Sequence, residues 1–239
     1  GVQTCALPIL VFPACHHRLG FPRSLLKRSF AVLVTIATVG GCGGRQPSAP
    51  AVSLTPKAAP VNAALNIVTT IVPLSRFTQA VAGDRGRVVQ LLPANTGPHD
   101  FQAKPQDLQT LAEAQVLVEN GLGLEGFLAD LIQNAHNPHL AIVNTSVGVP
   151  PLSNLQAQAG GAVNPHIWLD PQRAILQVKH IRDGLIAADP AGAPLYAANA
   201  AAYIQQLEAL DREFSQSLAP YRGETFITFH DFARYFADR

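Results

Sequence analysis

The stretch "NIVTTIV" (66–72) decides the fold. Six of its seven residues are β-branched, and apolar and polar residues do not alternate along it. A continuous run of this kind is typical of a strand that is buried on both faces of a parallel sheet. Pro73 follows directly and ends the run. We therefore expect a central strand over 66–72.

Similar runs follow along the chain, separated by helical patterns. The expected strands are "RVVQLLP" (87–93), "VLVE" (116–119) and "LAIVN" (140–144). The expected helices cover 74–82, a segment that opens at Pro105, and about 124–134. Strands that alternate with helices of this length predict a parallel, Rossmann-like α/β sheet with helices on both faces.

A further helix is predicted after the stretch "NPHIWLD" (164–170). Asp170 can cap its first turn, and Pro171 suits its first position. Apolar residues at helical spacing mark the face that we expect to be buried: Ala174, Ile175, Val178, Ile181 and Leu185. This helix would complete an N-terminal lobe over 66–188.

The longest helical pattern lies within 189–220, where apolar residues recur at steps of three and four. They are Tyr196, Ala200, Tyr203, Leu207, Leu210, Phe214 and Leu218. A helix of this length can connect two lobes. The remaining residues, 221–239, predict one strand and the beginning of a helix, which is too little chain for a core of its own. We expect two Rossmann-like βα lobes joined by a long rigid helix, with the second lobe largely missing from this chain.

The N-terminal region has the pattern of a lipoprotein signal. Within 18–42, basic residues precede an apolar run, and the run ends in Val39-Gly40-Gly41-Cys42. The run is too short for a membrane-spanning helix, and this order of charges is that of a secretory signal. The ending resembles a bacterial lipobox. We expect Cys42 to be lipidated and to become the first residue of the mature chain.

The segments on either side of this signal carry no fold. Residues 1–17 match neither a signal nor a domain, and we interpret them as non-native upstream sequence. Residues 43–65 are rich in Pro, Ala and Ser, as a flexible tether is. Cys5 and Cys15 would leave with the signal, so no disulfide is expected.

The charge balance argues against a nucleic-acid partner. The chain has 17 basic and 16 acidic residues, for a net charge of +1. Proteins that bind nucleic acid concentrate basic residues on one surface. Outside the N-terminal signal, this sequence has no such cluster.

Three histidines are candidate ligands, and the strand pattern places two of them, His99 and His230, where an α/β protein holds its ligands. His99 follows the second predicted strand, His166 lies in "NPHIWLD", and His230 follows the strand predicted in 221–239. Open α/β sheets bind ligands beyond the carboxyl ends of their strands. Neutral imidazole is a preferred donor to Zn²⁺, whereas Mn²⁺ favours carboxylate oxygens. Spacing alone leaves two interpretations open: a shared metal, or separate buried histidines.

Other polar and aromatic residues receive lesser roles. His136, His139 and His180 match no motif, and we interpret them as surface or loop residues. Asp100 and Asp231 each follow a candidate ligand; they could accept its second ring N–H or cap the next helix. Trp168 is interpreted as core packing beside the site.

Four stretches together resemble the periplasmic metal-binding family, the solute-binding subunits of zinc and manganese ABC importers. They are "GPHDFQAKPQDLQTLAEAQVLVENGLGLE", "NPHIWLDPQRA", "DPAGAPLYAANAAAYIQQLEALDREF" and "FITFHDFARYFADR". The resemblance runs from about Asn66 to Arg239. It implies two lobes joined by a rigid helix, with the metal in the cleft between them.

The resemblance also implies a ligand set. His99 and His166 match the family's two ligands in the N-terminal lobe, and His230 matches the first ligand of the other lobe. Histidine at this third place is the zinc-type choice, and manganese-type members have glutamate there. The fourth ligand would lie beyond Arg239. The histidine-rich loop of many zinc-type members is absent from 94–98 and from 145–163.

The implied function is a lipid-anchored receptor outside the bacterial cytoplasmic membrane, on its periplasmic or cell-surface side. It would capture Zn²⁺ and deliver it to an ABC permease, as a monomer when full length. A manganese receptor and an adhesin of the same fold remain alternatives. A zinc-dependent hydrolase is the enzymatic alternative, because three histidines with one open position also build hydrolytic sites. The sequence favours a receptor that is not an enzyme.

Overall fold

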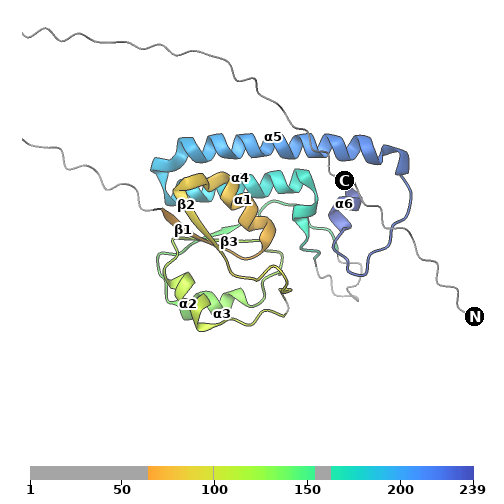
Figure 1. Cartoon of the computed structure of the whole chain (residues 1–239). Coiled ribbons are helices and arrows are strands. Elements are labelled where there is room, and N and C mark those ends of the chain that lie inside the picture. Colours follow the sequence, from red (N-terminus) through yellow and green to blue (C-terminus); the bar gives the residue numbers. More distant parts are fainter. Residues whose placement is uncertain (1–63, 99, 154–162) are drawn as a thin grey trace, which may run out of the picture. The chain divides into compact units, whose positions relative to one another are not determined.

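The computed structural model describes residues 64–98, 100–153 and 163–239, which belong to one compact unit, Pro56–Arg239. His99 and Cys42 lie outside the described residues. The centre of the unit is a four-stranded parallel sheet in the order β2-β1-β3-β4. Its strands are β1 (Leu65–Thr69), β2 (Gly86–Gln90), β3 (Val116–Glu119) and β4 (Ala141–Asn144). The predicted parallel α/β fold is confirmed (Figure 1).

Helices cover both faces of the sheet. They are α1 (Val72–Ala82), α2 (Pro105–Ala112), α3 (Leu128–Ala135), α4 (Pro171–Ala188), α5 (Ala193–Leu218) and α6 (Arg234–Asp238). Short 3₁₀ turns are η1 (Gly83–Arg85), η2 (Ile167–Leu169), η3 (Pro190–Gly192) and η4 (Ala219–Tyr221). Figure 1 shows α1 and α4 on one face and α2 and α3 on the other, with α5 lying over α1 and α4 as an outer layer. Among the described residues, no helix has the length and apolar character to span a membrane.

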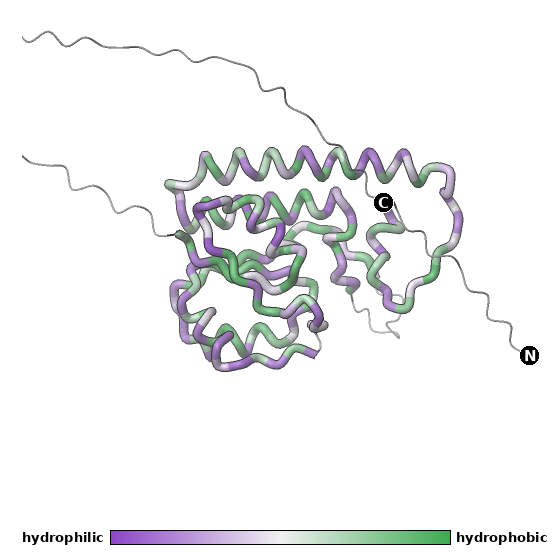
Figure 2. The backbone as a smooth tube through the Cα atoms, viewed as in Figure 1, coloured by the Kyte–Doolittle hydropathy of each residue, from purple (hydrophilic) through white to green (hydrophobic). Residues whose placement is uncertain are grey.

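The core lies where the sheet meets α1 and α4. Ile67 and Val68 of β1 and the three valine and leucine residues 116–118 of β3 are at most 2% exposed. The two central strands form one of the most continuously hydrophobic parts of the backbone in Figure 2. Layers of helices exclude water from both faces, which is why these strands show no alternation of polar and apolar residues.

The first two strands are shorter than predicted. β1 ends at Thr69, and Pro73 lies in the first turn of α1, where a missing N–H costs nothing. The ladder nevertheless continues past the strand ends, because the N–H of Leu91 donates to the Thr69 carbonyl at 2.8 Å. The β-branched run therefore includes a strand, a turn and the start of a helix.

The third helix begins at Leu128 rather than near 124. Gly121, Leu122 and Gly123 all have positive φ, a conformation that a helix cannot contain, and residues 124–127 form further bends and turns before the helix. The "NGLGLE" segment is instead a turn after β3.

The helix predicted after Asp170 is confirmed as α4. The Asp170 side chain accepts the Gln172 N–H at 2.9 Å, and Pro171 occupies the first turn. All five residues of the predicted apolar face are buried. At Gly184 the helix lies against Val143 of β4, and a Cβ at this position would overlap the valine side chain. The glycine allows α4 to approach the sheet closely.

The long helix is confirmed as α5, with 26 residues. Asp189, between α4 and α5, fixes its start: Arg85 donates Nε and Nη2 to its two oxygens at 2.5 and 2.9 Å. The Tyr196 hydroxyl donates to the same carboxylate at 2.7 Å. The Arg85 guanidinium is the main reason that the pKa of Asp189 falls to about 2. Farther along α5, Leu210 and Leu218 are exposed.

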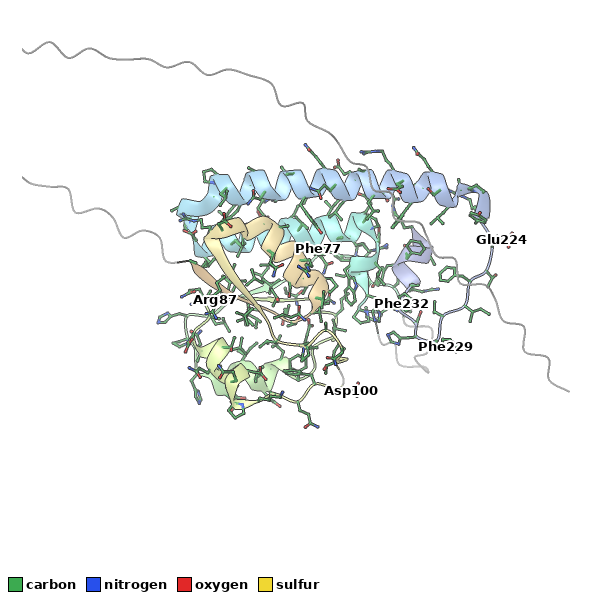
Figure 3. All side chains as sticks on the ribbon, viewed as in Figure 1. Phe77, Arg87, Asp100, Glu224, Phe229 and Phe232 are labelled. Atoms are coloured by element: carbon green, nitrogen blue, oxygen red, sulfur yellow. The ribbon has the colours of Figure 1, made fainter. Side chains whose placement is uncertain are left out.

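The strand predicted in 221–239 is wrong. Residues 224–228 form no ladder with any described strand, and Ile227 is 94% exposed. A strand forms when a neighbouring strand accepts its backbone hydrogen bonds, and the four described strands pair only with one another. The predicted helix does begin, as α6. Phe229 and Phe232, labelled in Figure 3, lie in the segment that precedes it.

Candidate metal centre

A cavity of about 300 Å³ opens beyond the carboxyl ends of the strands. The chain leaves β1 toward β2 on one side and returns to β3 on the other, so the strand order reverses beside β1. Such a switch point is where open α/β sheets bind ligands. The cavity wall is mainly apolar. Its residues come from the loops after β1, β2 and β3 and from the first position of α1: Ile71, Leu92, Pro93, Pro98, Leu124 and Val72.

His166 and His230 meet at this cavity. Their Nε2 atoms lie 3.1 Å apart, and their ring centroids lie 4.9 Å apart with the rings nearly perpendicular. His166 immediately precedes η2, and His230 comes from the segment before α6. Both residues line the cavity, together with Pro98, the neighbour of His99 in sequence. Two of the three predicted ligands are thus adjacent, and His99 itself is outside the described residues.

The spacing of the two nitrogens suits one ion. Two imidazole nitrogens bound to the same tetrahedral Zn²⁺, each at about 2.0–2.1 Å, are separated by about 3.3 Å. The observed 3.1 Å is close to that value. Within residues 64–98, 100–153 and 163–239, no group of three or more His, Cys, Asp or Glu side chains could hold a metal. The described part of the centre is therefore a pair of nitrogen donors.

The environment keeps His166 neutral. Burial lowers the pKa of His166 to about 4; the neighbouring His230 acts in the same direction, and Asp231 opposes it. A neutral imidazole is the form that binds a metal. The Trp168 and His166 rings make an edge-to-face contact at a centroid distance of 5.2 Å, and Trp168 is partly buried against the core, in agreement with its predicted packing role.

The loop that carries His166 is attached to the sheet by Asn120. The Asn120 side chain donates to the Pro165 carbonyl at 2.9 Å, and the Asn120 N–H donates to Glu125 at 2.8 Å. Glu125 also accepts the Thr70 hydroxyl at 2.7 Å, and burial raises the pKa of the Glu125 carboxyl. A buried network therefore links the ends of β1 and β3 to the residue before His166.

The two aspartates that follow candidate ligands differ in their surroundings. The backbone carbonyl of Asp231 accepts the side-chain amide of Asn164 at 2.5 Å, and the Asp231 charge acts on His166. Asp100 is exposed, at the edge of the molecule in Figure 3.

His136 and His139 are exposed loop or helix-end residues, as predicted. His180 is not: it lies half-buried on α4, and its Nδ1 contacts the Thr145 carbonyl at 3.0 Å, which a local motif cannot reveal.

Sequence reasoning missed the two asparagines of the site. Asn164 Oδ1 lies 3.0 Å from the His166 backbone nitrogen and 2.9 Å from its ring Nδ1. An Asn side chain that accepts the N–H two residues ahead is a turn signature, so the order Asn-Pro-His held a usable signal. Asn120 contacts Pro165 across 45 positions of the chain, and no local pattern could have revealed it.

Comparison with known proteins gives the same family for most of the chain. The pattern of the family described as "Zinc-uptake complex component A periplasmic" matches residues 67–239. The manganese-binding lipoprotein MntA of Halalkalibacterium halodurans is 30% identical over 212 residues, which cover 88% of this chain and 66% of that protein. The zinc-binding lipoprotein AdcA of Streptococcus pneumoniae is 31% identical over 183 residues, 72% of this chain and 36% of AdcA.

Solved structures agree with the fold. A crystal structure of ZnuA has a TM-score of 0.68 and 35% identity. The match covers 74% of this chain and 67% of the ZnuA chain. The crystal structure of Zn(II)-bound AdcA from Streptococcus pneumoniae has a TM-score of 0.66 and 31% identity. The match covers 73% of this chain and 37% of the AdcA chain. The chain thus spans about a third to two thirds of these proteins. By the family match, this protein belongs to the periplasmic zinc-uptake component A family, whose members are metal-binding receptors of ABC importers and not enzymes.

Proposed function

We propose that this protein captures Zn²⁺ outside the cytoplasmic membrane and delivers it to an ABC importer. The observation that carries the proposal is the approach of two imidazole nitrogens to 3.1 Å at the wall of an apolar cavity. His166 and His230 would bind the ion directly, and His99 would supply the third nitrogen. His99 is included because its neighbour Pro98 lines the same cavity.

Zinc is favoured over manganese by ligand chemistry. Imidazole nitrogen suits Zn²⁺, whereas Mn²⁺ prefers carboxylate and other oxygen donors. The apolar wall also favours an ion that sheds its water and binds protein nitrogen. A manganese receptor remains the second candidate, because the relative named MntA, a manganese-binding lipoprotein, matches 88% of this chain.

Calorimetric titration of the chain with Zn²⁺ and with Mn²⁺ tests the proposal. We expect tighter binding of Zn²⁺, with affinity strongly reduced in His166→Ala and in His230→Ala. His139→Ala is the matched control, since His139 is exposed and precedes β4, at the end of the sheet opposite the cavity. Because most sites bind Zn²⁺ more tightly than Mn²⁺, a Mn²⁺ affinity that matches or exceeds the Zn²⁺ affinity would favour the second candidate. Equal Zn²⁺ affinities in the wild type and all three variants would contradict the site.

A lipid anchor at Cys42 is part of the proposal. It rests on the basic, apolar and small-residue order of 18–42, and two relatives are named lipoproteins. Expression in a bacterium with labelled palmitate should label the protein and should not label Cys42→Ala. Equal labelling of both would contradict the anchor while leaving the metal site untouched.

A further inference from the structure

The side chain of Asn164 contacts the segments of both histidines. Its Oδ1 accepts the backbone N–H of His166 at 3.0 Å and lies 2.9 Å from the His166 ring Nδ1. Its Nδ2 donates to the backbone carbonyl of Asp231, the residue after His230, at 2.5 Å. Asn164 is 1% exposed, so water cannot replace these partners at low cost.

The partners leave one orientation for the Asn164 amide. A backbone N–H only donates, so the atom facing His166 must be the oxygen; a carbonyl only accepts, so the atom facing Asp231 must be the nitrogen. The oxygen, in turn, requires that the His166 Nδ1 carry a hydrogen. The His166 Nε2 then presents its lone pair to the His230 Nε2, 3.1 Å away, and can accept a hydrogen from that ring while no metal is bound.

We infer that Asn164 is a positioning residue for the metal centre: its oxygen fixes the tautomer of His166, and its nitrogen holds the His230 segment beside it. The purpose that we assign to Asn164 rests on the proposed function, whereas its contacts with the two histidine segments involve no metal. One side chain thus joins two ligands that are 64 residues apart in the sequence. Ordering both donors before the ion arrives removes a conformational cost from binding.

An amide is suited to this double role in a way that a carboxylate is not. Aspartate at this position could still accept from His166. It could not donate to Asp231, and two oxygens would face each other at the place of a hydrogen bond. Asn164→Asp therefore separates the two functions, and Asn164→Ala removes both.

The test uses the full chain without metal, labelled with ¹⁵N-histidine, at a pH where the imidazoles are neutral. Two-bond ¹H–¹⁵N spectra report the tautomer of His166, and ring-to-ring Overhauser effects report its contact with His230. The wild type should show hydrogen on Nδ1 of His166 together with the ring contact. Asn164→Asp should keep the tautomer and lose the contact, whereas Asn164→Ala should lose both. Zn²⁺ affinity should fall by about 10–100-fold in Asn164→Ala, the usual effect of removing a group that orients a ligand.

Asn199→Ala is the matched control, because the Asn199 side chain donates to the Val81 carbonyl between α5 and α1, away from the cavity. It should change neither histidine signal. An unchanged tautomer in a folded Asn164→Ala protein would overturn the inference. If that variant does not fold, Asn164→Asp decides: an altered tautomer, or a retained ring contact, overturns it. Expected spectra combined with absent metal binding would refute the proposed function and leave the role of Asn164 intact.

Discussion

The Nε2 atoms of His166 and His230 lie 3.1 Å apart although 64 residues separate them in the sequence. Two parts of the fold produce this contact. The network of Asn120 and Glu125 holds the loop before His166 on the sheet. The Tyr235 hydroxyl of α6 donates to the Asn164 carbonyl at 2.7 Å and so holds the His230 segment against the same loop. The geometry of the pair therefore depends on contacts that the loop before His166 makes with both the sheet and α6.

The low pKa of His166 predicts a loss of stability in mild acid. The unfolded chain protonates this histidine near 6.5, and the folded protein does so at about 4. Between these values the unfolded state binds more protons, so the free energy of unfolding should fall as the pH drops from 6.5 to 4. Urea unfolding of the metal-free protein at several pH values measures this. His166→Gln should flatten the dependence and His139→Gln should not; identical slopes in all three would refute the prediction.

The contact of α4 with β4 predicts a costly substitution. In Gly184→Ala the new methyl group would overlap Val143, so α4 must move away from the sheet. Overpacking of this kind typically costs about 1–3 kcal/mol in the free energy of unfolding. Chemical denaturation measures the loss. Gly126→Ala is the control, since a methyl group there would meet no atom within 4 Å. If the control loses as much unfolding free energy as Gly184→Ala, close packing is not the cause.

The start of α5 predicts a role for the Tyr196 hydroxyl. Tyr196 is fully buried, and its hydroxyl donates to Asp189, which also binds Arg85. A hydrogen bond to a charged group contributes about 1.5–3 kcal/mol, so Tyr196→Phe should lower the free energy of unfolding by about 2 kcal/mol. Tyr221→Phe, at a 64% exposed residue, should have no measurable effect. Equal stabilities of both variants and the wild type would contradict this role.

The helix α4 shows what sequence can predict. Its cap at Asp170, its proline and its apolar face are local features, and each of them lies where the pattern indicates. The alternation of strands and helices is local as well, and it predicted the parallel sheet. Boundaries were less accurate, because the β-branched run continues past the end of β1 to the first residue of α1, although such residues favour strands.

The errors concern contacts between distant segments. The segment 224–228 has a strand-like composition, but no described strand pairs with it. His180 matches no sequence motif, and only the folded structure shows that it contacts the Thr145 carbonyl. The roles of Asn120 and Asn164 depend on partners 45 and 67 positions away. Strand pairing and side-chain networks require the tertiary structure, which one sequence does not contain.

X-ray absorption at the zinc edge of the Zn²⁺-loaded protein tests the central claim most directly. We predict zinc–nitrogen distances of about 2.0–2.1 Å with the multiple scattering of imidazole rings. The imidazole signal should decrease by one ring in each of His99→Ala, His166→Ala and His230→Ala, and it should be unchanged in His139→Ala. A spectrum without imidazole ligands, or one that stays the same in His166→Ala and His230→Ala, would contradict a zinc centre built on this histidine pair.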